Sequence, residues 1–224
     1  MRNYLRGTFT VYKKDLVLEM RSKEIISTLV IFSILVALIF SFAFDPSPRI
    51  ITVVGPGIIW VAYTFAGILG LGRVFSQEID RGTLEGIIIS PLSKDSLYMG
   101  KLLGSLTLMT VVEIIMLPVF IIFFDLNLLN FWFFLLTFLA TVGFAAVGTV
   151  FSALAINTRS REMMLPILFL PMVVPVIISA VAGTQDILNG RGWDDIGEWI
   201  KLLIAFDLIF IVLSSILFEF LLEE

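Results

Sequence analysis

Cysteine and histidine are both absent from this chain of 224 residues. The chain therefore cannot form disulfides, carry out thiol chemistry or hold a metal through Cys or His side chains of its own. Charged residues are also scarce, at 15%, against about 25% in a typical soluble domain. The formal net charge is −4, which argues against nucleic acid as a partner.

Apolar residues make up the rest of the chain: 58% of it is hydrophobic, and its mean hydropathy is +1.03. A helix needs about 20 mostly apolar residues to cross a bilayer. We therefore predict an all-α polytopic membrane protein, with six transmembrane helices in a single domain over residues 1–224. The six runs are 25–44, 50–72, 102–124, 126–158, 163–183 and 202–222.

Positive charge is distributed unevenly between the two predicted sides of the membrane. Of 15 Lys and Arg residues, 12 lie in the segments 1–24, 73–101 and 159–161. Because Lys and Arg concentrate in cytoplasmic loops, these segments are predicted to be cytoplasmic. Six spans then place both termini in the cytoplasm and segment 184–201 on the opposite, periplasmic side.

The first extramembrane segment, residues 1–24, has an apolar repeat at helical spacing. The repeat consists of Leu5, Phe9, Tyr12, Leu16 and Met20. It predicts an amphipathic helix that lies on the cytoplasmic membrane surface. A solvated basic tail is the alternative.

The second segment, the cytoplasmic loop 73–100, combines charges of both signs with apolar residues. The charges are Glu78, Asp80, Arg81 and Glu85, and the apolar residues are Leu84, Ile87, Ile88 and Ile89. Such a surface favours docking onto another protein, and a hairpin that only joins two spans is the alternative. Ser93 is predicted to cap the helix that follows.

The third segment, 184–201, is acidic and carries Trp193 and Trp199. Tryptophan concentrates at the membrane–water boundary, so we predict a short amphipathic helix on the outer face with these indoles as anchors.

Two carboxylates, Glu113 and Asp207, interrupt predicted spans. At 1.5 Å per residue, Glu113 lies about 18 Å from the cytoplasmic edge, and Asp207 lies about 9 Å from the outer edge. Both could line one polar cavity and serve an ion-coupled secondary transporter. Alternatively, each is a structural carboxyl group bonded to a neighbouring helix.

Small residues recur every fourth position in two of the spans. Gly100 and Gly104 form one pair, and Thr141, Ala145, Thr149 and Ala153 form a longer stripe. Such patterns permit close helix packing, within the chain or against a second copy of it.

No catalytic signature is present, and we expect no enzymatic activity. Residues 67–74 resemble a phosphate-binding loop only faintly, because Arg73 and Val74 stand where Lys and Ser or Thr belong. Energy for transport would therefore come from an ion gradient or from a partner ATPase.

The loop contains the stretches Phe75–Glu78, Asp80–Gly86 and Ser90–Ser93, and the N-terminal segment contains the stretch Asp15–Glu24. These stretches resemble those of the haem exporter protein B family, the permease subunit of the bacterial cytochrome c maturation system. A generic form of the motif also occurs in other ABC-2 exporters, so a permease for a drug, lipid or polysaccharide is the alternative.

The resemblance implies an ABC-2-type, type V exporter-like permease in the bacterial inner membrane. Its partners would be a cytoplasmic ABC ATPase, which binds ATP, and membrane subunits that handle haem, so this chain would bind no cofactor directly. It would couple ATP hydrolysis to haem export or to release of a haem-loaded periplasmic chaperone. The coupling residues implied by position are Gln77, Glu78, Asp80, Arg81, Gly82, Thr83, Leu84 and Glu85.

Overall fold

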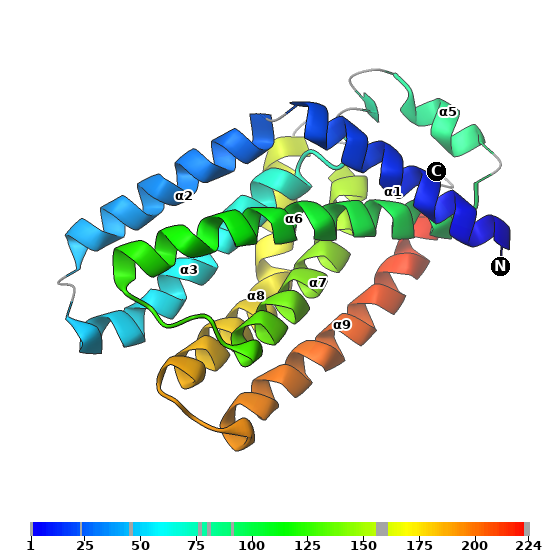
Figure 1. Cartoon of the computed structure of the whole chain (residues 1–224). Coiled ribbons are helices and arrows are strands. Elements are labelled where there is room, and N and C mark those ends of the chain that lie inside the picture. Colours follow the sequence, from blue (N-terminus) through cyan, green and yellow to red (C-terminus); the bar gives the residue numbers. More distant parts are fainter. Residues whose placement is uncertain are drawn as a thin grey trace.

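The computed structural model describes residues 2–22, 24–44, 47–75, 78–79, 82–90, 92–155 and 161–221. The regular structure in these ranges is helical, which confirms the predicted all-α class (Figure 1). The helices are α1 (Arg2–Ser22), α2 (Glu24–Ala43), α3 (Pro48–Leu71), α5 (Leu84–Ile89), α6 (Lys94–Phe124), α7 (Phe131–Leu154), α8 (Arg161–Leu188) and α9 (Trp193–Leu221).

Five helices are long and apolar enough to cross a membrane, namely α3, α6, α7, α8 and α9. The chain is therefore a polytopic membrane protein. The predicted first span corresponds to α2, whose described apolar part, Ser27–Ala43, is shorter than the other five. Six spans thus remain a prediction.

A side chain caps the first turn of each of the helices α6 and α7. Ser93 caps α6 as predicted, since its hydroxyl oxygen accepts the Ser96 amide at 3.3 Å. Asn130 caps α7 in the same way, through the Trp132 amide at 3.1 Å. These side chains satisfy amides that have no partner within the helix.

The predicted limits of the fourth span were wrong at its start. The run was expected from residue 126, but α6 ends at Phe124, its C-cap Asp125 is in a left-handed conformation with φ 49°, and α7 begins only at Phe131. Leu126 and Leu128 belong to the intervening turn and are buried, with 5% and 0% of their surface exposed. An apolar turn of this kind cannot be distinguished from a span by composition.

The structure has no separate short helix within residues 184–201, contrary to expectation. Helix α8 continues to Leu188, and α9 begins at Trp193. The apolar residues of this segment, Ile187, Ile196 and Ile200, are buried in the main core. They extend the inner faces of the two long helices.

Helix α7 lies at the centre of the bundle and packs against α3, α6, α8 and α9. Its stripe of Thr141, Ala145, Thr149 and Ala153 is buried. The small residues therefore mediate packing within this chain.

Helix α1 lies along the start of α6 (Figure 1). Its buried side consists of Gly7, Thr8 and Val11. Leu5 and Phe9, the start of the predicted apolar repeat, are 62% and 63% exposed. The predicted helix is confirmed, and these two apolar side chains face away from the bundle.

The start of α1, the end of α9 and α5 lie at one end of the molecule, whereas the end of α2 and the turns after α6 and α8 lie at the other (Figure 1). Contacts between distant segments agree with this arrangement. Phe75 stacks on Phe218 at a centroid distance of 6.1 Å, so the C-terminal part of α9 meets the loop that follows α3.

Candidate functional site

A buried group of charges joins α1, α6 and the loop after α3. Lys101 of α6 is 1% exposed. Its Nζ donates to Glu78 Oε1 at 2.6 Å and to the Val74 carbonyl at 2.7 Å, and it lies 3.2 Å from Asp15 Oδ2. These partners belong to α1 and to the loop after α3, so the ammonium group of α6 holds three segments together.

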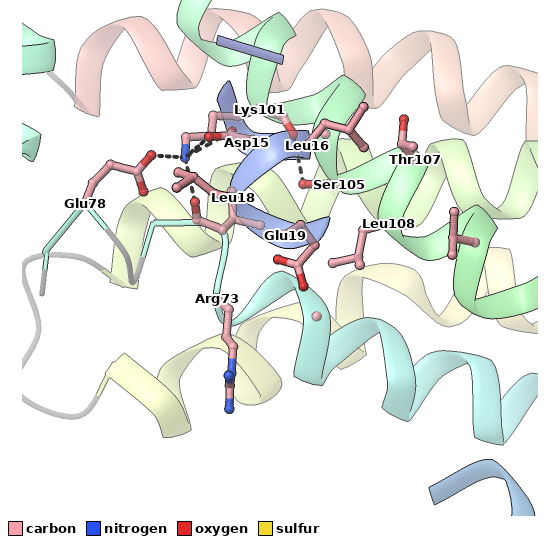
Figure 2. A pocket seen from close by; sticks show the side chains of 14 residues that line it. Asp15, Leu16, Leu18, Glu19, Arg73, Glu78, Lys101, Ser105, Thr107 and Leu108 are labelled. Carbon is pink, nitrogen blue, oxygen red and sulfur yellow. Dashed lines mark hydrogen bonds and ion pairs between the residues drawn. The ribbon is translucent and has the colours of Figure 1, made fainter. Parts of the chain in front are cut away.

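Lys14 adds a second cation to this group. Its Nζ contacts Glu78 Oε1 and lies 3.0 Å from Asp15 Oδ1. Two lysines thus face two carboxylates, and we call Lys14, Asp15, Glu78 and Lys101 the charge cluster. Figure 2 shows Lys101 pointing to Asp15 and Glu78. The Phe75 ring adds a cation–π contact, with its centroid 4.7 Å from Lys101 Nζ.

The opposite charges of the cluster shift the pKa values of Glu78 and Lys14. Burial by itself would raise the pKa of Glu78, but Lys101 and Lys14 outweigh it and hold that pKa below its ordinary value. Burial likewise acts to lower the pKa of Lys14, yet Glu78 and Asp15 raise it overall. Opposite charges at short range therefore decide the protonation state.

The structure places Glu78 inside the protein. Only 4% of its surface is exposed, although the sequence pattern placed it in a docking patch. A partner could touch this carboxylate only if the charge cluster opened. In the structure, Glu78 anchors the loop to α1 and α6.

The other predicted coupling residues are described to different extents. Gly82, with φ 62°, and Thr83 form a turn in which the Thr83 amide donates to the Glu78 carbonyl at 2.9 Å. Leu84 and Glu85 begin α5. Gln77, Asp80 and Arg81 lie outside the described residues.

Among the α5 side chains whose exposure the structure describes, one large apolar group is uncovered. Ile89 is 83% exposed. Ile87, in contrast, packs against the cluster of buried residues that includes Val11, Phe75 and Phe218. Ile87 thus faces the bundle, and Ile89 is open to a partner.

The sequence did not indicate three of the site residues, Lys14, Asp15 and Lys101. Lys101 stands 23 positions after Glu78 and 86 after Asp15, so only the fold brings them together. A usable signal was its place between Gly100 and Gly104, where a helix was expected to pack closely.

Next to the charge cluster is a cavity of about 300 Å³. Its walls are the second half of α1, the end of α3 with the following loop, and the first half of α6 (Figure 2). The lining residues are Asp15, Leu16, Leu18, Glu19, Gly70, Arg73, Val74, Glu78, Lys101, Gly104, Ser105, Thr107, Leu108 and Val111.

Glu19 gives the cavity a further carboxylate. Burial raises its pKa and Asp15 raises it further, while Arg73 acts in the opposite direction. The cavity therefore has charges of both signs in its lining.

Glu113 is buried, with 7% of its surface exposed, and is bonded to the neighbouring helix. The Thr141 hydroxyl of α7 lies 2.7 Å and 2.9 Å from its two carboxylate oxygens. A small cavity of about 10 Å³ beside it also touches Tyr63 and Leu108. These contacts support the structural interpretation of Glu113.

Asp207 is also buried, with 5% exposed, and neither carboxylate oxygen has a hydrogen-bond partner among the described residues. It faces α7 at Gly143, where a Cβ atom would lie 2.9 Å from Asp207 Oδ1. The cavity at Glu113 does not include Asp207. The two carboxylates therefore do not share that cavity.

Among the described residues, no group of three acidic side chains is placed to hold a metal ion. The contacts that the structure shows at the site are ion pairs, hydrogen bonds and packing at the junction of α1, α6 and the loop.

Comparison with known proteins covers nearly the whole chain. A family model described as CcmB protein matches residues 6–222. The chain is 29% identical over 171 residues to heme exporter protein B of Pseudomonas aeruginosa, covering 76% of each protein. It is 26% identical over 171 residues to heme exporter protein B of Haemophilus influenzae, covering 76% of this chain and 77% of that protein. The protein of the same name from Bradyrhizobium diazoefficiens is 27% identical over 162 residues, or 72% of this chain and 73% of that protein.

Proposed function

The chain belongs to the CcmB protein family, and from this premise we propose that it is the permease component of a haem export system worked by a separate ATPase. The charge cluster is the observation that supports coupling between the ATPase and the helices of this chain. It ties the loop that bears α5 to both α1 and α6, so a push on that loop moves two helices together.

The proposed topology has six spans of ABC-2 type in the bacterial inner membrane, with both termini in the cytoplasm. Helix α2 supplies the additional span: it has 20 residues, which at 1.5 Å per residue is about the thickness of the hydrocarbon core. The position of both termini at one end of the molecule supports an even number of spans (Figure 1). Helix α1 would lie in the cytoplasmic interface with Leu5 and Phe9 toward lipid.

In this proposal α5 is the element that contacts the ATPase. Ile89 provides an exposed apolar anchor at the end of α5, and Gly86 of the same helix and Thr83 at its start are also exposed. Glu78 acts one step behind the contact, as a positioning residue within the charge cluster. Closure of the ATPase would then shift α6 and α1 relative to the rest of the bundle.

We propose that the chain itself is not an enzyme. It ligates no haem through His or Cys, since it contains neither. Haem would be handled by further membrane subunits and ATP by the ATPase. The output would be haem export or release of a haem-loaded periplasmic chaperone in cytochrome c maturation.

The Ile89→Asp variant tests this proposal. A charge at the centre of an apolar contact costs binding energy, so we expect about ten-fold less ATPase recovered with the affinity-tagged chain. Leu129→Asp is the matched control, because Leu129 is 70% exposed in the turn at the opposite end of the molecule. Equal recovery of ATPase with both variants would remove α5 as the contact. Failure of haem-handling subunits to copurify with the wild-type complex would favour another export substrate.

A further inference from the structure

The carboxyl group of Glu113 shares its hydroxyl partner with a backbone carbonyl. Thr141 Oγ1 of α7 lies 2.7 Å and 2.9 Å from the two Glu113 oxygens and 2.8 Å from the Thr137 carbonyl oxygen. A hydroxyl group has one proton to donate and two lone pairs that accept. If Glu113 were ionised, all three neighbouring oxygens would compete for that one proton. A proton on Glu113 ends the competition, because Glu113 then donates to Thr141 and Thr141 donates to Thr137.

No salt bridge among the described residues includes Glu113. Lys101, on the same helix, is about 18 Å away along the helix axis and is paired within the charge cluster. Only 7% of the Glu113 surface is exposed. A buried carboxylate without a paired cation is costly, and such a group takes up a proton instead.

The side chains around Glu113 are mostly apolar. Among the described residues that line the small cavity, Tyr63 of α3 is the other ionisable one, and α2 contributes Leu29. The Tyr63 hydroxyl donates to the Glu113 backbone carbonyl, at 3.4 Å. Asp207 of α9 faces Gly143 instead, and the carboxylates of α1 line the large cavity. An ionised Glu113 would therefore be an isolated buried charge.

Two cavities lie in a row between the charge cluster and Glu113. The large cavity, of about 300 Å³, includes Lys101, and the small one, of about 10 Å³, includes Glu113. Both are lined by Gly70 of α3 and Leu108 of α6. Gly70 has no side chain to fill this junction, where a Cβ atom would lie 3.4 Å from Leu108 Cδ2. Figure 2 shows Glu78 and Leu108 at opposite ends of the large cavity.

We propose that Glu113 is a proton-binding site, whose carboxyl group holds a proton in the folded protein and donates a hydrogen bond to Thr141. The proton exchanges with water from the end of the molecule that bears the charge cluster, through the large cavity and past Gly70 and Leu108. Water can reach that end, since the Lys14 side chain of the charge cluster is 37% exposed. Loss of the proton would leave an isolated charge between α6 and α7 and weaken their contact.

Infrared spectroscopy of the purified full chain in detergent tests the protonation. At about pH 7 exposed glutamates are ionised, so only protonated carboxyl groups contribute an acid C=O stretching band. We expect Glu113→Gln to lose one such band. Glu198→Gln is the control, because it removes an exposed carboxylate and should lose none. An acid band region that is unchanged in Glu113→Gln would show that Glu113 is ionised and would overturn the site.

Thr141→Val provides a second measurement that does not depend on the folding of the glutamine variant. Valine has nearly the same shape as threonine but no hydroxyl acceptor. The acid band of Glu113 should therefore remain and move to higher frequency. A band at the wild-type frequency would overturn the hydrogen bond to Thr141.

The rate at which this band shifts after transfer to heavy water measures access to the site. Gly70→Val places a side chain at the junction of the two cavities and is expected to slow the shift several-fold. Gly57→Val is the matched control on α3, since Gly57 lines neither cavity and a Cβ atom there has nothing within 4 Å. Equal rates in the two variants would overturn the route past Gly70. None of these readouts requires the ATPase or a known membrane orientation, so they are separate from the test of the proposed function.

Discussion

At the scale of single residues, Lys101 is the member of the charge cluster with the most buried polar contacts. It is 1% exposed and holds two carboxylates and a backbone carbonyl. Burying an ammonium group is costly, and the cost is met here because each of its donors has an acceptor. The same arrangement makes the site sensitive to loss of one partner.

Lys101→Met is therefore expected to destabilise the protein by about 3–5 kcal/mol, since it leaves buried carboxylates without this cation. Thermal unfolding of the detergent-solubilised protein measures the effect. Lys13→Met is the control, because Lys13 is exposed on α1. A Lys101→Met, Glu78→Gln double variant should recover part of the loss, as expected for coupled partners. A transition temperature equal to that of the control would show that the ion pairs contribute nothing.

Acid should remove the contribution of Glu78. Its pKa in the folded protein lies below the ordinary value of 4.5. Stability from this group is therefore complete above its unfolded-state pKa and is lost as the pH falls through the lower, folded-state value. We expect the transition temperatures of wild type and Glu78→Gln to differ at neutral pH and to converge in acid, in a titration from about pH 7 to about pH 3.

The exposed Glu198 supplies the matched carboxylate for that titration. Glu198→Gln should follow the wild-type curve throughout. A constant difference between wild type and Glu78→Gln at every pH would contradict the assigned protonation of Glu78.

At the scale of helices, the contact between α1 and α6 depends on Gly100. A Cβ atom there would lie 2.6 Å from Val11 Cβ and 3.0 Å from the Thr8 carbonyl oxygen. Neither atom can move by side-chain rotation, so the whole of α1 would have to shift. Close approach of the two helices requires a glycine at this position.

Gly100→Ala is expected to lower the transition temperature and to loosen the contact between α1 and α6. Overpacking of this kind costs about 1–3 kcal/mol of folding stability. Gly57→Ala is the matched change, because a Cβ atom on Gly57 of α3 would have nothing within 4 Å. That variant should be neutral or stabilised by the higher helix propensity of alanine. Limited trypsin cleavage at Arg6 and thermal unfolding measure both effects. Similar behaviour of the two alanine variants would show that α1 does not depend on the close approach.

The long apolar helices could be predicted from sequence because each is an apolar run with few charges, as in α8 and α9. The start of α6 could be predicted because Ser93 caps it, whereas the C-terminal ends of α2 and α6 could be predicted because the apolar runs stop there. The start of α7 was missed because the buried turn at Leu126 and Leu128 is as apolar as a span. The inward position of Glu78 was missed because its partners lie on α1 and α6, and spacing along the chain carries no information about such contacts.

At the scale of the whole molecule, the arrangement in the membrane depends on α2. If α2 crosses the bilayer, the turn after it lies on the opposite side from α1, together with the turn between α8 and α9. If it does not, Phe44 at the end of α2 lies on the same side as α1. The two topologies therefore differ at one position.

Single introduced cysteines can distinguish these topologies by their labelling. The chain has no cysteine of its own, so labelling of the chain reports only the introduced position. Phe44→Cys and Arg191→Cys are suitable reporters, since Phe44 is 38% exposed and the Arg191 side chain is 54% exposed. Lys13→Cys reports on α1. In spheroplasts, a membrane-impermeant maleimide should label the Phe44 and Arg191 variants at once and the Lys13 variant only after permeabilisation. Protection of the Phe44 variant together with the Lys13 variant would show that α2 does not cross, and the six-span topology would be wrong.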